Sequence, residues 1–229
     1  MVAGKIAKTV ALLILAVVEG QVPVFPFLHQ PILSRCCQLV TSRGSVIHIT
    51  PTRLPGFIVI EPTVHRDQRG FFVESYREDV LAAAGLVTDW VQDNHARSTR
   101  GVLRGMHFSV DPGQVKLVRC ARGRVLDVAV DIRRGSPTFG RWDAVELDDE
   151  TGRQAYVPLG FAHGYFVLSD VADVVYKCSA YYDPARERGI RFDDPAVGIE
   201  WPDGERIVSA RDTEAPLLAD IAEDLPFTF

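Results

Sequence analysis

The chain has 229 residues, 47% hydrophobic and 24% charged, which is enough for one substantial folded domain and unlike a disordered protein. Its formal net charge of −5 at pH 7 argues against a broad nucleic-acid-binding face, but it leaves room for a small basic pocket that takes a phosphorylated ligand. The cysteines Cys36, Cys37, Cys120 and Cys178 contain no Cys-x-x-Cys pair. This pattern favours reduced structural thiols over a zinc site or a disulfide framework.

Residues 1–44 differ in character from the rest of the chain. Lys5 and Lys8 precede an apolar run at 10–18, as in a secretory signal, but the run is shorter than the ~20 apolar residues that span a bilayer. Three origins are compatible with it: a signal peptide, a disordered or docking extension, and an upstream stretch included by a misplaced start. We favour the last two. The predicted organisation is therefore an N-terminal extension at 1–44 and one domain at 45–229.

From Ser45 onward, short β-rich runs alternate with turn residues, which is typical of an all-β sandwich or barrel. Strands are expected at 46–50, 57–61, 71–75, 91–95, 101–108, 115–121, 125–132, 142–147, 154–157, 162–168 and 173–178. Residues 65–70 are expected to form a polar turn, residues 77–85 a short helix, and Arg122-Gly123 a hairpin turn. The acidic tail at 212–229 is expected to be partly helical.

The expected strand at 101–108, GVLRGMHF, carries an arginine and a histidine among apolar neighbours. A charged or titratable group in such a place is costly unless it has a partner or a function. Arg104 and His107 are three residues apart, so an uninterrupted strand directs them to opposite faces. Either Gly105 allows a bulge that redirects one of them, or the two side chains serve the sites of different subunits.

Ten short motifs that combine polar and glycine residues follow one another between residues 67 and 216. They are DQRGFFVE at 67–74, QDN at 92–94, GVLRGMHF at 101–108, VK at 115–116, DVAVD at 127–131, GSPTFG at 135–140, GFAHG at 160–164, VYK at 175–177, YDP at 182–184 and SARDTEAP at 209–216. In order and spacing, they resemble the dTDP-4-dehydrorhamnose 3,5-epimerase family over roughly residues 45–216. The resemblance implies a cupin-type jelly roll with a few short helices, a homodimer, and a cytoplasmic enzyme of sugar metabolism without a membrane partner. Residues 1–44 have no counterpart in it.

The implied activity is that of an isomerase. It inverts C3 and C5 of dTDP-4-dehydro-6-deoxy-D-glucose, giving dTDP-4-dehydro-L-rhamnose. Both carbons lie beside a ketone, so the reaction needs a base, a group that stabilises an enolate, and an acid on the opposite face. The resemblance assigns these roles to His107, Lys116 and Tyr176. Asp212 is the implied partner of His107, and Asp127 is a second carboxylate that could take that place.

The resemblance also implies a set of substrate-binding residues. Arg69 and Arg104 match arginines that contact the diphosphate, a role that suits a planar cation with several donors. The other positions surround the thymidine and the sugar or have less defined roles: Glu74, Gln92, Asn94, His163, Tyr182 and Glu187. Among these, Tyr182 matches an aromatic residue that lies against the base, and His163 matches a second pocket histidine.

Many cupins bind a metal through a His-x-His pair, but Ser109 stands two residues after His107. We therefore predict no metal and no organic cofactor. Three alternatives stay open: an epimerase that acts on C3 alone or C5 alone, a non-catalytic cupin that binds a nucleotide sugar, and a metal-dependent cupin. The presence of both His107 and Tyr176 favours the double epimerase.

Overall fold

In a computed structural model of the protein, residues 38–42 and 45–229 are described. The apolar run at 10–18, Cys36 and Cys37 lie outside these residues. Across the described residues, no helix is long and apolar enough to cross a membrane.

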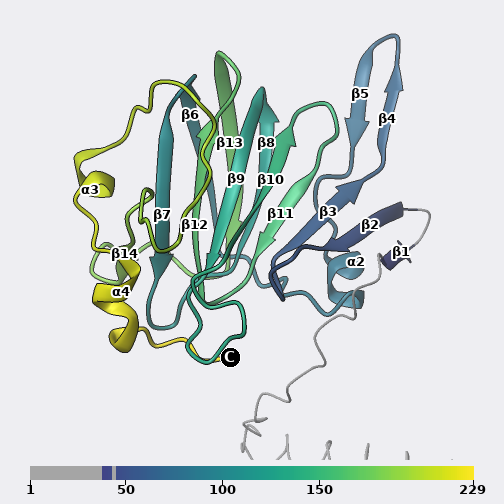
Figure 1. The fold of residues 1–229 in the computed structure, drawn as a ribbon. Coiled ribbons are helices and arrows are strands. Elements are labelled where there is room, and N and C mark those ends of the chain that lie inside the picture. The colour runs from purple at the N-terminus through teal and green to yellow at the C-terminus, as the bar shows by residue number, and fades with distance from the viewer. Residues whose placement is uncertain (1–37, 43–44) are drawn as a thin grey trace, which may run out of the picture. The chain divides into compact units, whose positions relative to one another are not determined.

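Two antiparallel sheets face each other and form a jelly roll (Figure 1). The larger sheet has the spatial order β1 (Gln38–Ser42), β2 (Ser45–Pro51), β3 (Ile58–Pro62), β11 (Gln154–Val157), β8 (Lys116–Arg122), β13 (Val171–Cys178) and β6 (Gln92–Thr99). The smaller sheet has the order β10 (Trp142–Asp148), β9 (Arg124–Asp131), β12 (Phe161–Val167), β7 (Leu103–Ser109) and β14 (Glu187–Gly189). The all-β prediction is confirmed.

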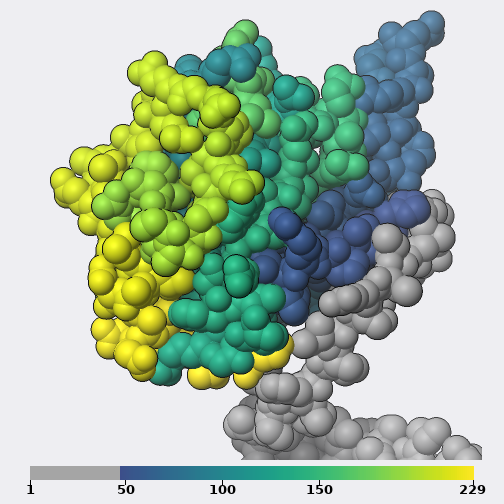
Figure 2. Space-filling view, viewed as in Figure 1, coloured from purple at the N-terminus to yellow at the C-terminus, as the bar shows by residue number. Residues whose placement is uncertain are grey.

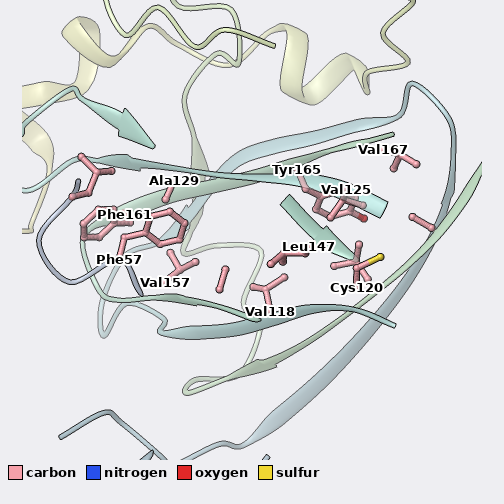
Figure 3. Packing of buried hydrophobic residues seen from close by; sticks show 14 residues of the cluster. Phe57, Val118, Cys120, Val125, Ala129, Leu147, Val157, Phe161, Tyr165 and Val167 are labelled. Atoms are coloured by element: carbon pink, nitrogen blue, oxygen red, sulfur yellow. The ribbon is translucent and has the colours of Figure 1, made fainter. Parts of the chain in front are cut away.

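The main core lies between the sheets, where alternate side chains of facing strands meet (Figure 3). In β12, Phe161, Tyr165 and Val167 belong to this inner cluster, whereas Ala162 and Phe166 belong to a second cluster on the outer face. All seven residues of β12 are buried as a result. The residues that point inward from this strand and its neighbours are therefore the ones that can line a site inside the barrel.

The C-terminal segment covers the outer face of the smaller sheet. Val197, Trp201, Leu218 and Leu225 complete the second cluster, and Figure 2 shows this segment in yellow-green and yellow over the left of the domain. The tail contains α3 (Ala210–Thr213), α4 (Leu218–Ile221) and the 3₁₀ turn η1 (Ala222–Asp224), so the partly helical tail is confirmed. This segment brings the residues around 207–212 back onto β7.

Each expected strand has a counterpart, and the helix expected at 77–85 is α2 (Glu78–Ala83). Gly123 has φ +77°, as a turn between β8 and β9 requires. The polar turn expected at 65–70 is partly wrong, because β4 (Val64–Asp67) pairs with β5 (Gly70–Val73) as a hairpin arm. Both strands of the arm are largely exposed, so no apolar face marks them in the sequence.

Two further strands were not expected. β14 has only three residues, too few to show a period. β1 pairs with β2 upstream of residue 45, so the sheet includes part of the segment that was expected to lie outside the domain.

Candidate active site

A cavity of about 570 Å³ is lined by strands of both sheets and by residues 207–212. It gathers most of the predicted site residues: Asn94, Arg104, His107, Lys116, His163, Tyr176, Tyr182, Glu187 and Asp212. A second cavity, of about 240 Å³, lies elsewhere and shares no lining residue with the first. The larger cavity is the candidate active site because the titratable side chains converge there.

His107 and Asp212 form a hydrogen-bonded pair, with 2.7 Å between His107 Nε2 and Asp212 Oδ1. The other carboxylate oxygen accepts from the Gly105 N–H at 3.3 Å, and the Asp212 N–H donates to Ser209 Oγ at the start of α3. Burial by itself raises the pKa of Asp212, but the hydrogen bonds from His107 and Gly105 outweigh it and hold this pKa below its ordinary value. Asp212 is therefore an acceptor for Nε2–H, which leaves the Nδ1 lone pair of His107 available as a base.

A bulge in β7 lets Arg104 and His107 line the same cavity. The register between β7 and β12 shifts at this point, and Gly105 has φ +141°. A Cβ on Gly105 would lie 2.5 Å from the Cα of Gly164, so the strands approach too closely for any side chain. The bulge that Gly105 was predicted to allow is present, and both side chains serve one cavity.

His163 and Asp127 form a second, more buried pair. His163 Nε2 lies 2.9 Å and 3.1 Å from the two carboxylate oxygens of Asp127. Asp127 is 0% exposed and His163 is 7% exposed. His107 and His163 are directly opposite each other on β7 and β12. Of the two carboxylates that the sequence offered, Asp212 contacts His107, and Asp127 contacts His163.

Lys116 and Tyr176 lie on the larger sheet, across the cavity from the strand that carries His107. Burial lowers the pKa of Lys116, and the nearby Cys178, Glu187 and Asp127 oppose this shift in part. Burial raises the pKa of Tyr176 to about 12, so its phenol is protonated at neutral pH. A lysine amine and a phenolic proton donor thus face His107 from the opposite wall.

Polar residues of β6 hold side chains of the cavity wall in place. Gln92 does not line the cavity itself, but its amide donates to Asn94 at 2.9 Å and accepts from the Tyr182 N–H at 2.8 Å. Arg104 Nε donates to Ser98 Oγ at 3.2 Å. These contacts fix Asn94, Tyr182 and Arg104 where they can bind a ligand.

Besides Gln92, two predicted binding residues lie outside the cavity. Arg69 is at the tip of the β4–β5 arm, where its side chain is 84% exposed and pairs with Asp67. Glu74 follows the arm, lines the smaller cavity and lies 3.7 Å from Arg77. In Figure 1 the arm is at the opposite side of the sheets from β14 and α3, so a single chain does not bring these residues to the site.

Four polar residues of the cavity wall were not predicted: Gln114, Tyr165, Ser209 and Arg211. Arg211 immediately precedes Asp212 and pairs with Glu187 at 3.0 Å, so a basic residue next to the predicted carboxylate was a usable signal. Tyr165 is two residues from His163 on the same strand, and a period of two places them on one face. Gln114 stands in a connecting segment outside the quoted motifs, and Ser209 opens the motif at 209–216 but carries no charge that would mark it as a binding residue.

Within residues 47–229, no group of three or more His, Cys, Asp or Glu side chains is arranged to hold a metal ion. Both cavity histidines are bonded to carboxylates instead. Cys120 and Cys178 are free buried thiols, and burial raises the pKa of each. The absence of a metal and of a cofactor stays a prediction.

Comparison with known proteins gives one consistent result. A sequence profile of the dTDP-4-dehydrorhamnose 3,5-epimerase family matches residues 51–220. The enzyme of that name from Shigella flexneri is 47% identical over 176 residues, which cover 76% of this chain and 97% of that protein.

Solved structures agree with the sequence match. A 3,5-epimerase from Legionella pneumophila, in complex with dTDP-4-keto-L-rhamnose, superposes with a TM-score of 0.77 at 44% identity and covers 80% of this chain and 98% of its own. A 3′-monoepimerase from Streptomyces bikiniensis, in complex with dTDP-quinovose, has a TM-score of 0.72 at 43% identity and covers 76% and 89% of the two chains. The profile match, the sequence identities and the shared cupin-type jelly roll together show that this chain belongs to the dTDP-4-dehydrorhamnose 3,5-epimerase family.

Proposed function

We propose that the protein inverts C3 and C5 of dTDP-4-dehydro-6-deoxy-D-glucose and forms dTDP-4-dehydro-L-rhamnose. One observation carries the proposal: His107, bonded to a buried carboxylate, lies on the smaller sheet, and Tyr176 lies on the larger sheet of the same cavity. Inversion at a carbon requires that a proton leaves one face and returns to the other. A base and an acid on opposite walls supply that geometry.

The first step is removal of a proton beside the C4 ketone. His107 Nδ1 takes the proton from the carbon, and the electron pair of the broken C–H bond moves toward the C4 oxygen. Asp212 stabilises the imidazolium that forms, since its carboxylate accepts from Nε2 at 2.7 Å. Lys116 stabilises the charge on the C4 oxygen, and such electrostatic support is usually the largest catalytic contribution.

The second step returns a proton to the opposite face. Tyr176 is a phenol at neutral pH because burial raises its pKa to about 12. Its O–H proton passes to the carbon as the enolate collapses to the ketone. Before the second carbon reacts, His107 releases its proton to solvent and Tyr176 takes a proton back from solvent. The same two steps then invert the second carbon, because C3 and C5 flank the same ketone.

The binding residues suit a sugar nucleotide. Arg104 and Arg211 bring two cations to the cavity for the diphosphate, and Tyr182 offers an aromatic face for the base. Arg69 and Glu74 can take part only if the β4–β5 arm of one subunit reaches the cavity of another. The exposure of Phe71 (53%) and Phe72 (66%) on that arm supports a homodimer built in this way.

Proton exchange in D₂O, followed by NMR with the 4-keto substrate, tests the function. We expect deuterium at both C3 and C5 and a product with both centres inverted. Exchange at one carbon only supports a single epimerase instead, the reaction class of one solved structure with this fold. Binding without any exchange supports the non-catalytic alternative.

The role of His107 is tested by His107→Ala. Loss of the base should lower kcat by about 10²–10⁴-fold with little change in nucleotide binding. His48→Ala, on an exposed position of β2, is the matched control and should keep full activity. Turnover of the H107A protein at the wild-type rate would contradict the assignment of the base.

A further inference from the structure

The segment at 180–182 carries Tyr182, which lines the active-site cavity. It follows β13 and belongs to no strand or helix. In the part of the chain that the structure describes, no hydrogen bond between main-chain groups involves this segment. Tyr182 itself is 53% exposed, so packing around its ring does little to fix its position. The backbone of the segment must therefore be held by side chains.

Two glutamine side chains supply these hydrogen bonds. Gln114 Nε2 donates to the carbonyl oxygen of Ala180 at 2.8 Å. Gln92 Oε1 accepts from the Tyr182 N–H, also at 2.8 Å. The two contacts lie on either side of Tyr181 and use one main-chain acceptor and one main-chain donor. Together they bracket the stretch of backbone that carries the Tyr182 ring.

Each glutamine comes from an anchored part of the fold. Gln92 begins β6, and its amide also donates to Asn94 at 2.9 Å. Gln114 precedes Val115, whose N–H donates to Ser179 Oγ at 2.9 Å and whose carbonyl accepts from the Ser179 N–H at 3.1 Å. The two side chains can therefore impose a position on a segment that has no regular structure of its own.

Resting on the function proposed above, we propose that Gln114 is a positioning residue for the nucleotide base. It acts with Gln92 on the backbone of 180–182 and so places the Tyr182 ring where a base can lie against it. An aromatic ring that is held in place before the ligand arrives loses less conformational entropy on binding. The effect of Gln114 is therefore on affinity for the nucleotide and leaves the proton transfers at His107 unchanged.

Gln114→Leu removes the amide and keeps most of the side-chain volume. We expect dTDP to bind about threefold to tenfold more weakly by calorimetry, as the loss of one hydrogen bond implies. kcat should stay near the wild-type value, because His107 keeps its bond to Asp212. Tyr181→Ala is the matched control: Tyr181 lies in the same segment, is 72% exposed and does not line the cavity, so its loss should leave dTDP affinity unchanged.

A double-mutant cycle with Tyr182→Ala separates positioning from direct contact. If Gln114 acts through Tyr182, Gln114→Leu should cause no further loss of dTDP affinity in the Tyr182→Ala protein. A loss of the same size in both backgrounds would overturn the proposal, since Gln114 would then touch the ligand itself or only support the fold.

Amide hydrogen exchange of the free protein gives a readout without ligand. The peptide that covers 179–187 should exchange faster in the Gln114→Leu protein, because its backbone has lost one of its two side-chain contacts. Unchanged exchange together with wild-type dTDP affinity would refute the positioning role.

The proposed function fails by a separate result. A wild-type protein that binds dTDP but exchanges no substrate hydrogen refutes the epimerisation, and the double-mutant cycle still decides the role of Gln114. A wild-type protein that binds no dTDP overturns both proposals.

Discussion

The two histidines of the cavity have the same kind of partner but different exposure. The side chain of His107 is 24% exposed and that of His163 is 8% exposed, and each is bonded to a carboxylate. Proton exchange with a bound sugar requires access to a ring nitrogen, which favours His107 as the base. His163 is better suited to hold the wall of the cavity, since Asp127 accepts from it with both oxygens.

Lys116 is expected to lower the stability of the folded protein while it supports activity. Its lowered pKa means that the folded protein disfavours the charged lysine. In the unfolded chain this lysine titrates near its ordinary pKa of ~10.4. Between the two pKa values the unfolded state binds more protons, so this residue makes the free energy of unfolding rise with pH in the window that ends at the unfolded pKa of ~10.4. Below the window the full cost of the buried charge is present.

We therefore predict that Lys116→Met raises the free energy of unfolding at neutral pH and removes this pH dependence, while kcat falls by about 10²–10³-fold. Denaturant unfolding at neutral and alkaline pH, together with turnover, measures both effects. Lys177→Met is the control, because Lys177 pairs with Asp93 and does not line the cavity. An active K116M protein would remove Lys116 from the mechanism.

At the scale of elements, the bulge in β7 decides which side chains reach the substrate. Gly105 has a positive φ, and its backbone touches that of Gly164 on β12. The outer residues Leu103, Met106 and Phe108 then pack under the C-terminal segment, while Arg104 and His107 turn inward. Without the bulge, a strand with a strict period of two would send one of these polar residues into the outer core.

Gly105→Ala should destabilise the protein by about 1–3 kcal/mol and lower kcat, because the added Cβ would lie 2.5 Å from the Cα of Gly164. Gly204→Ala is the matched control, since Gly204 has φ +123° with nothing within 4 Å of an added Cβ. Thermal unfolding and turnover of the two variants distinguish a clash at the bulge from the cost of a positive φ alone. Equal effects in both variants would mean that the contact with Gly164 is unimportant.

At the scale of the whole molecule, the β4–β5 arm stands apart from the cavity of its own chain. Arg69 and Glu74 match substrate-binding positions, yet the arm exposes Phe71 and Phe72 and lies away from the cavity of its own chain. An exposed apolar surface next to a basic side chain suits docking on a second copy near its diphosphate site. Each site of the proposed dimer then contains residues of both subunits.

Mixing two inactive variants tests this arrangement. Arg69→Ala removes the residue on the arm, and His107→Ala removes the base of the cavity. In a mixed dimer one site receives Arg69 from one subunit and His107 from the other, so a statistical mixture should recover about a quarter of wild-type activity. Analytical ultracentrifugation confirms that dimers are present. No recovery after exchange of subunits would show that the arm serves no partner site.

The sequence by itself determined the class of fold and the chemistry of the site. Strand periodicity and turn residues locate the barrel because each strand has a buried face, and ordered motifs nominate His107, Lys116 and Tyr176. The sequence did not predict the paired strands of the exposed β4–β5 arm or the three-residue β14, because neither shows the alternation of buried and exposed residues that marks a strand.

Only the tertiary structure decided which side chains meet. The sequence left Asp127 as a possible alternative to Asp212 for the partner of His107, and packing assigned each carboxylate to a different histidine. Arg211 and Tyr165 joined the site because the C-terminal segment folds back onto β7 and because β12 lies beside it. Local sequence controls backbone conformation over a few residues, whereas contacts between strands distant in the chain depend on how the sheets close around the core.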